Sequence, residues 1–206
     1  MKAVGLAGVV LVLCSLLPAL ARAQEKQGFE LGVRTGFMTP LGSAAAGSAK
    51  AMNATIAGEI PIWIDLGGRV SPAVFVGGYA SYGLIGIAGG SCYGDCSHHV
   101  LRVGAEMHYH FAPTAKMDPW LGAGVGYEGL QFNQSYAGGT VDGTAHGLEF
   151  LNAQFGLDFA LSPNLALGPF LGATISQYNT DFGGGDLAQK AIHSWFSLGV
   201  RLSVVP

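Results

Sequence analysis

The chain has 206 residues, of which 50% are hydrophobic and only 11% are charged, with a formal net charge of −3 and a mean hydropathy of +0.38. Soluble domains usually carry about 25% charged residues, whereas a helical membrane protein shows apolar runs of about 20 residues, which the sequence lacks beyond its first 23 residues. The basic residues are scattered, so no basic surface for a nucleic-acid partner is predicted.

Residues 1–23 have the organisation of a secretory signal peptide. The apolar stretch Ala3–Leu17 is followed by the small residues Ala21 and Ala23, which stand where a signal peptidase requires small side chains. A bilayer anchor is the alternative, but the apolar stretch is shorter than the roughly 20 residues of a spanning helix. Cleavage after Ala23 would leave residues 24–206 as one domain, with eight basic against 13 acidic residues.

Alternation of apolar and polar residues with period two predicts β-strands along the rest of the chain. It is clear at Phe29–Phe37, at Leu101–Phe111, and at Ile56–Leu66, where Ile56 falls on the apolar face. Five weaker segments complete a set of eight: Ala73–Leu84, Trp120–Glu128, Phe150–Leu161, Leu165–Tyr178 and Ser194–Val204. Strands of about ten residues are long enough to cross a bilayer at a tilt. The sequence therefore predicts an all-β fold, a single eight-stranded antiparallel transmembrane barrel.

The connections between these strands alternate in length. Long connections are expected at residues 39–55, 85–99, 129–149 and 179–193, and short ones at 69–72, 112–119 and 162–164. Long loops at one end and short turns at the other are typical of bacterial outer-membrane barrels.

Charged residues decide which face of the wall points outward. A charge on the lipid-facing surface near the midplane costs about 2–4 kcal/mol, so we expect the charged face to line the lumen. The residues predicted to form this lumenal network are Glu30, Arg34, Glu59, Asp65, Arg102, Glu106, His108, His110, Glu128, Asp158 and Arg201. Because eight strands enclose a space that side chains nearly fill, the network should plug the barrel.

The strand pattern, the stretch Pro119–Tyr127 and the ending Ser197–Val204 resemble the small outer-membrane barrels, the family of OmpX, OmpW and the membrane domain of OmpA. The ending is similar to the assembly signal of that family, with Val204 where a terminal aromatic is usual. The resemblance implies a location in the bacterial outer membrane, contact with outer-membrane lipid and recognition by the barrel insertion machinery.

Two short motifs and two prolines remain. Cys92 and Cys96 fall in a long loop of an exported chain, which favours a disulfide; a metal site with His98 or His99 is the alternative. The match of residues 124–129 to a dinucleotide-binding fingerprint lies within a strand and opens no helix, so it carries no function.

Pro61 and Pro169 fall inside predicted strands, where we expect bulges or shifted strand ends.

No catalytic residue, metal or cofactor is expected. A hydrolase would need a serine, a histidine and a carboxylate together, and the neighbours His193 and Ser194 point to opposite faces of a strand. The leading hypothesis is a non-enzymatic envelope protein whose loops serve adhesion or contact with an external ligand. A narrow OmpW-like channel for small or apolar molecules is the alternative, and a soluble ligand-binding barrel is a third class.

Overall fold

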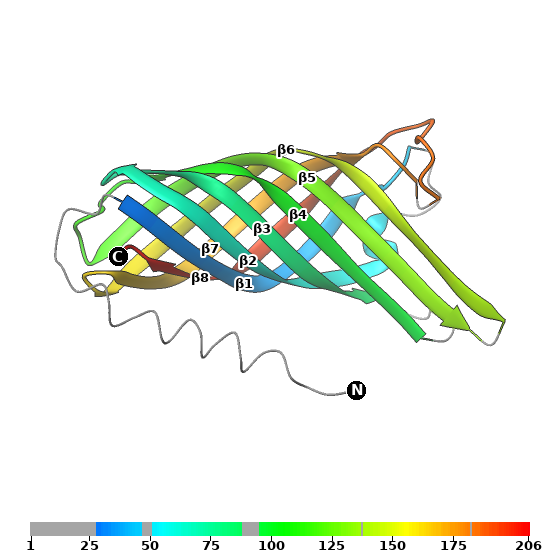
Figure 1. Cartoon of the computed structure of the whole chain (residues 1–206), viewed down its shortest axis with the longest axis horizontal. Helices are drawn as coiled ribbons and strands as arrows, with labels where there is room; N and C mark the ends of the chain where they lie inside the picture. Colours follow the sequence, from blue (N-terminus) through cyan, green and yellow to red (C-terminus); the bar gives the residue numbers. More distant parts are fainter. Residues whose placement is uncertain (1–27, 47–50, 88–94, 137, 182) are drawn as a thin grey trace.

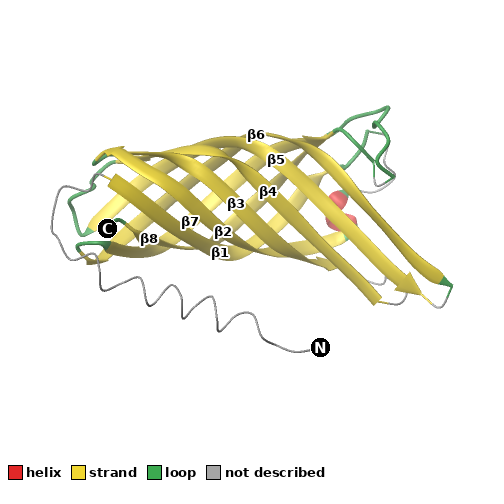
Figure 2. Ribbon diagram, in the orientation of Figure 1, coloured by secondary structure: helices red, strands yellow, loops and turns green. Residues whose placement is uncertain are grey.

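The computed structural model describes residues 28–46, 51–87, 95–136, 138–181 and 183–206. Eight strands form one closed antiparallel ring in chain order, in which β1 also pairs with β8 (Figures 1 and 2). The strands are β1 Gly28–Gly42, β2 Ile56–Ser71, β3 Val74–Ile87, β4 Asp95–His110, β5 Met117–Tyr136, β6 Gly139–Ser162, β7 Leu165–Tyr178 and β8 Ile192–Val204. The prediction of a single eight-stranded antiparallel barrel is confirmed.

The two ends of the ring differ. Short connections, residues 72–73, 111–116 and 163–164, lie at one end together with the start of β1 and the end of β8 (Figure 1), and we call it the turn end. The opposite, loop end carries residues 43–46 and 51–55, which include the 3₁₀ turn η2 (Met52–Ala54), and residues 179–181 and 183–191. The predicted signal peptide, residues 1–23, lies outside the described residues. Among the described residues, no helix is long and apolar enough to cross a membrane.

The prediction of a long loop at residues 129–149 is wrong. β5 continues to Tyr136 and β6 begins at Gly139, and the two strands stay paired up to Tyr136↔Gly139. The segment Gly129–Glu149 is therefore a paired β5–β6 ribbon, which projects beyond the ring at the loop end (Figure 1). β4 accompanies it as far as the pair Asp95↔Ser135.

Bulges change which residues face inward. The register of β6 shifts between Glu149 and Leu151, so that Phe150 and Leu151 are both exposed and Glu149 turns inward. A second shift lies between Ile56 and Gly58. It places Ile56 inside the barrel, 7% exposed, which corrects its assignment to the outer face.

Neither proline inside a strand sits at a bulge or a strand end. The ladder between β1 and β2 passes from Thr35↔Ile62 to Met38↔Glu59 without the rungs between them, and Pro61 lies in that gap. Pro61 contributes its carbonyl oxygen, which accepts a hydrogen bond of 2.8 Å from the Thr35 hydroxyl. Pro169 likewise pairs with β8 but lies beside missing rungs of the β6–β7 ladder. Each proline thus faces a gap where no backbone donor is needed.

At the seam where the ring closes, only glycine fits on both strands. Gly36 and Gly199 are partners across the β1–β8 seam. A Cβ on Gly36 would lie 2.2 Å from the Leu198 carbonyl oxygen, and one on Gly199 would lie 2.1 Å from that of Thr35. The two glycines therefore allow the first and last strands to approach closely where the ring closes.

Candidate functional site

The barrel is polar inside and apolar outside. Each strand exposes large apolar side chains on the outer wall, among them Phe37, Ile62, Val76, Leu101, Leu121, Phe155, Leu171 and Leu198. Among strand residues whose side chains are described, the only exposed charge is that of Asp142, in the β5–β6 ribbon. A water-soluble barrel has the opposite distribution. The apolar middle of this outer wall is therefore suited to contact the hydrocarbon of a bilayer.

The interior near the turn end is organised around Arg201. Its guanidinium donates 2.6 Å and 2.7 Å hydrogen bonds to Glu30 and Asp158 and lies 4.8 Å from the centre of the Trp120 ring. The Trp120 indole also donates to Asp158 at 3.1 Å. Arg69 joins from β2 through a 2.5 Å ion pair with Glu30. All five side chains are at most 4% exposed.

Arg34 organises the middle of the lumen. It pairs with Asp65 at 2.6 Å and with Glu106 at 3.1 Å, and it also donates to the amide oxygen of Gln154. The Gln154 amide donates in turn to Glu106 at 3.0 Å. The Arg34 guanidinium lies 4.7 Å from the centre of the Trp63 ring. Residues from strands β1, β2, β4 and β6 thus meet at one point across the lumen.

Arg102 organises the layer nearest the loop end. It forms two hydrogen bonds with Glu59, of 2.7 Å and 3.0 Å, and a third of 2.8 Å with Glu128. Glu149 lies 3.8 Å from its Nε atom. The guanidinium lies 5.0 Å from the centre of the Trp195 ring. The interior therefore repeats one unit three times: an arginine, two or three carboxylates and one of the protein's three tryptophans.

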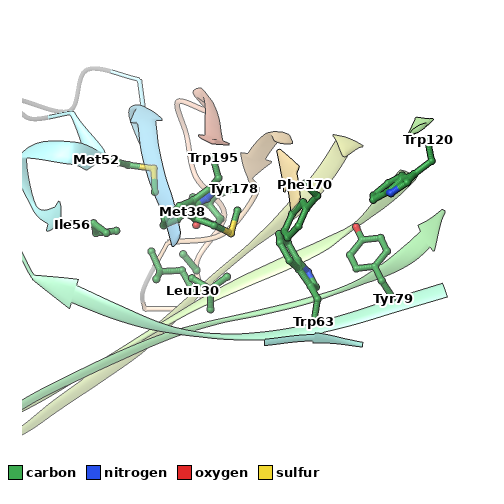
Figure 3. Close-up of a cluster of buried hydrophobic side chains, with 12 residues drawn as sticks. Met38, Met52, Ile56, Trp63, Tyr79, Trp120, Leu130, Phe170, Tyr178 and Trp195 are labelled. Atoms are coloured by element: carbon green, nitrogen blue, oxygen red, sulfur yellow. The ribbon is translucent and has the colours of Figure 1, made fainter. Parts of the chain in front are cut away.

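An apolar cap covers the Arg102 layer at the loop end. Met52 from η2 reaches inward to Met38 and Trp195, while Ile56 and Leu130 complete the cluster (Figure 3). These side chains are at most 7% exposed. Met52 of η2 thus lies over the mouth, and the Arg102 layer beneath it is buried.

Of the three buried histidines among the described residues, His108 and His110 were predicted to belong to the lumenal network. The Nδ1 atom of His110 contacts Asp118 at 2.9 Å, and the other ring nitrogen contacts Arg69 at 3.1 Å. The Nε2 atom of His108 lies 3.3 Å from Glu106 without hydrogen-bond geometry. His110 is therefore part of a hydrogen-bonded chain, whereas the ring nitrogens of His108 have no hydrogen-bond partner among the described residues.

Acidic groups outnumber arginines in this interior. Among the described residues, eight buried carboxylates surround four buried arginines: Glu30, Glu59, Asp65, Glu106, Asp118, Glu128, Glu149 and Asp158, with Arg34, Arg69, Arg102 and Arg201. Several buried oxygens, including one of Asp65, one of Glu106 and one of Glu149, have no hydrogen-bond partner within the described part of the chain.

The structure places all eleven residues of the predicted lumenal network inside the barrel, each at most 4% exposed. Sequence reasoning missed Arg69, which was placed in a turn, and Glu149, which was placed in a loop. Both occupy paired strand positions. The pattern also gave no indication that Trp63, Trp120 and Trp195 stack on arginines, because the partners come from different strands.

The remaining sequence-based expectations concern a disulfide and a metal site. Cys92 lies outside the described residues, so the disulfide with Cys96 stays a prediction. No group of three or more His, Cys, Asp or Glu side chains that could hold a metal ion occurs among the described residues.

One serine does lie beside a histidine and a carboxylate. Ser176 is the cross-strand partner of His193, whose Nε2 contacts Glu128 at 3.0 Å. All three side chains are at most 1% exposed. A substrate therefore has no access to the serine hydroxyl, and the arrangement serves packing inside the plug.

Comparison with known proteins supports the fold. No protein-family model matches the chain, and no curated protein matches its sequence. The chain is similar to the crystal structure of Neisserial surface protein A, with a TM-score of 0.55, 16% identity, and coverage of 87% of this chain and 97% of that chain. It also matches the outer membrane protein OprG of Pseudomonas aeruginosa, with a TM-score of 0.46, 11% identity, and coverage of 87% and 98%. The first likeness shows that the chain has the fold of the small outer-membrane β-barrels.

Proposed function

We propose that the protein is a non-enzymatic barrel of the bacterial outer membrane, which supports the envelope and presents its loop end for contact outside the cell. The apolar outer wall and the charged interior support the membrane location, because this arrangement places each buried charge away from lipid. A soluble ligand-binding barrel would need the opposite distribution of polarity.

The single observation that carries the structural role is the filled interior. Arg201, Arg34 and Arg102 each bridge carboxylates across the lumen at successive heights, and the Met52 cap lies above them. Eight strands leave an interior that side chains can fill. Three cross-lumen layers and a cap favour a closed scaffold over an open channel.

The projecting ribbon supports a role in contact with other proteins. β6 pairs with β7 only from Gly147 onward, and the backbone of His146 bonds to residues 179 and 180. Within the described part of the chain, the residues Gly139–Ala145 have no strand partner on this edge. Unpaired strand edges can accept an extended segment of another protein.

Ion conductance tests the closed scaffold. We expect the folded barrel to carry no steady current in planar bilayers, and the paired substitution Met52→Ala with Leu130→Ala to remain silent, because the three arginine layers lie beneath the cap. A steady current in the unmodified protein that falls on substitution of Arg102 or Glu106 would instead establish the channel. Slower migration of the boiled than of the unboiled sample in gels checks that the barrel was folded.

A second candidate function, binding or uptake of a small apolar molecule, is favoured by one cavity. A space of about 470 Å³ opens at the loop end above the cap, and its lining is mainly apolar. Ile56, Ile87, Leu130 and Val141 contribute to it. Loss of ligand binding on Leu130→Asp, with the gel shift retained, would support this function.

A further inference from the structure

Three neighbouring strands of the outer wall change from apolar to polar at a common level near the loop end. On β5 the outward residues pass from Tyr127 through Gly129 to Gln131, and on β4 they pass from Leu101 to His99. On β6 the outward positions from Leu148 toward the tip are His146 and Thr144. If the barrel spans a bilayer, as proposed above, this level is where hydrocarbon gives way to head groups, and exposed tyrosines are typical of it.

A groove lies at this level because one position lacks a side chain. Gly129 is the cross-strand partner of both Leu101 and His146. A Cβ on Gly129 would point into the groove and lie 3.2 Å from the Nδ1 atom of His146. The groove has a volume of about 330 Å³ and is lined by the outward side chains of the three strands. Its lining is His99, Leu101, Val103, Tyr127, Gly129, Gln131, Thr144 and His146.

Two aromatic pairs stiffen the polar rim. The rings of Tyr127 and His146 stack with centres 5.8 Å apart and planes 22° apart. Those of Tyr82 and His99 lie 5.1 Å apart at 32°. Each histidine thus packs against a tyrosine of the neighbouring strand, and these contacts restrict its ring before any ligand arrives.

The polar groups of the groove are suited to hydrogen bonding. Its polar lining consists of two imidazoles, the Gln131 amide, the Thr144 hydroxyl and the Tyr127 phenol, and no lysine or arginine is among its lining residues. Phosphate groups are usually bound by arginine or lysine, whereas the hydroxyls of a sugar both donate and accept hydrogen bonds, as these side chains do. Val103 and Leu101 continue the groove as an apolar surface on the side toward the middle of the barrel.

We propose that this groove is a binding site for a glycolipid of the outer leaflet. The sugar head group lies against Gln131, His99 and His146, and an acyl chain follows Leu101 and Val103. The site rests on the proposed membrane location, since its apolar part must face hydrocarbon.

The test uses the full-length mature barrel reconstituted in phosphatidylcholine nanodiscs. Digalactosyl diacylglycerol is added in one sample and phosphatidylglycerol with the same acyl chains in another, and native mass spectrometry counts the lipid retained per barrel. We expect a preference of about fivefold for the sugar lipid, the size that one hydrogen bond supplies.

Two substitutions place the lipid in the groove. Gly129→Leu fills it, and His146→Phe keeps the stack on Tyr127 but removes both ring nitrogens; each should abolish the preference. Ala105→Leu, which places the same leucine side chain on the lipid-facing side of β4 outside the groove, should retain it. Equal retention of the two lipids, or an unchanged preference in Gly129→Leu and His146→Phe, would overturn the proposal. A barrel that fails to enter the nanodisc at all would count against the membrane location instead.

Discussion

Arg102 and Glu59 face each other across the lumen through two parallel hydrogen bonds, Nη1 to Oε1 at 2.7 Å and Nη2 to Oε2 at 3.0 Å. Replacement of Arg102 by Met would leave Glu59 and Glu128 buried without their cation. We expect a loss of about 3–5 kcal/mol of unfolding free energy, measured by urea titration in lipid vesicles. Arg102→Lys keeps the charge but loses the paired geometry, so its loss should be smaller; equal stability of Arg102→Met and the unmodified protein would contradict this role.

Glu149→Gln should behave differently from Arg102→Met. One Glu149 oxygen has no hydrogen-bond partner among the described residues and lies 3.8 Å from Arg102, while the other accepts a hydrogen bond from Tyr79. Glutamine can still accept from Tyr79, and it removes one of three carboxylates around a single guanidinium. We expect the unfolding free energy to stay within about 1 kcal/mol or to rise. A loss as large as that of Arg102→Met would show that the third carboxylate is required.

Fluorescence of the three tryptophans tests whether water reaches the arginine layers inside the barrel. Trp63, Trp120 and Trp195 are at most 1% exposed, so the folded barrel should fluoresce at short wavelength and resist quenching by acrylamide. Unfolding in urea should shift the emission to the red and make it quenchable. Ready quenching of the folded protein would mean that water reaches the arginine layers.

The polarity of the wall can be tested at one outward position. Val125 is 57% exposed on the outer face of β5, and Val125→Arg should cost about 2–4 kcal/mol of stability in a bilayer. The control Thr140→Arg adds the same charge near the tip of the ribbon and should have no effect. Equal stabilities of the two variants would place Val125 in water.

Shortening the ribbon tests its role in adhesion. Removal of residues 134–141 joins Asn133 to Asp142, which are cross-strand partners, and leaves them as a two-residue turn. Bacteria that display the shortened barrel should adhere less well to cultured epithelial cells than those with the intact ribbon. Both proteins should show the same shift on boiling. Unchanged adhesion would remove the ribbon from the proposed contact surface.

Period-two alternation was sufficient to predict the barrel and its inner face. Successive side chains of a strand point to opposite faces, so one charged residue assigned to the lumen fixes the direction of its neighbours. Glu106 and His108 were assigned correctly on this basis to the lumen. The β5–β6 ribbon was missed since it is rich in glycine and polar residues, and beyond the ring both of its faces are partly exposed, which removes the contrast on which the pattern depends.

Other misses have local causes. The bulge near Glu149 reverses the alternation by one residue, and no local pattern marks that position. Arg69 was assigned to the short connection at residues 69–72, but β2 extends to Ser71. The partners of each arginine could not be predicted, since Arg201 and Glu30 are 171 residues apart.

That separation has a consequence for assembly. Arg201 of the last strand meets Glu30 of the first only when the ring is complete, and the polar partners of Arg34 come from three other strands. A sheet of six or seven strands in a membrane would therefore hold unmatched charges against lipid, with nothing to neutralise them. We therefore expect closure of the seam to accompany formation of the ion pairs inside the barrel, because a partly closed barrel in the bilayer would expose these charges to lipid.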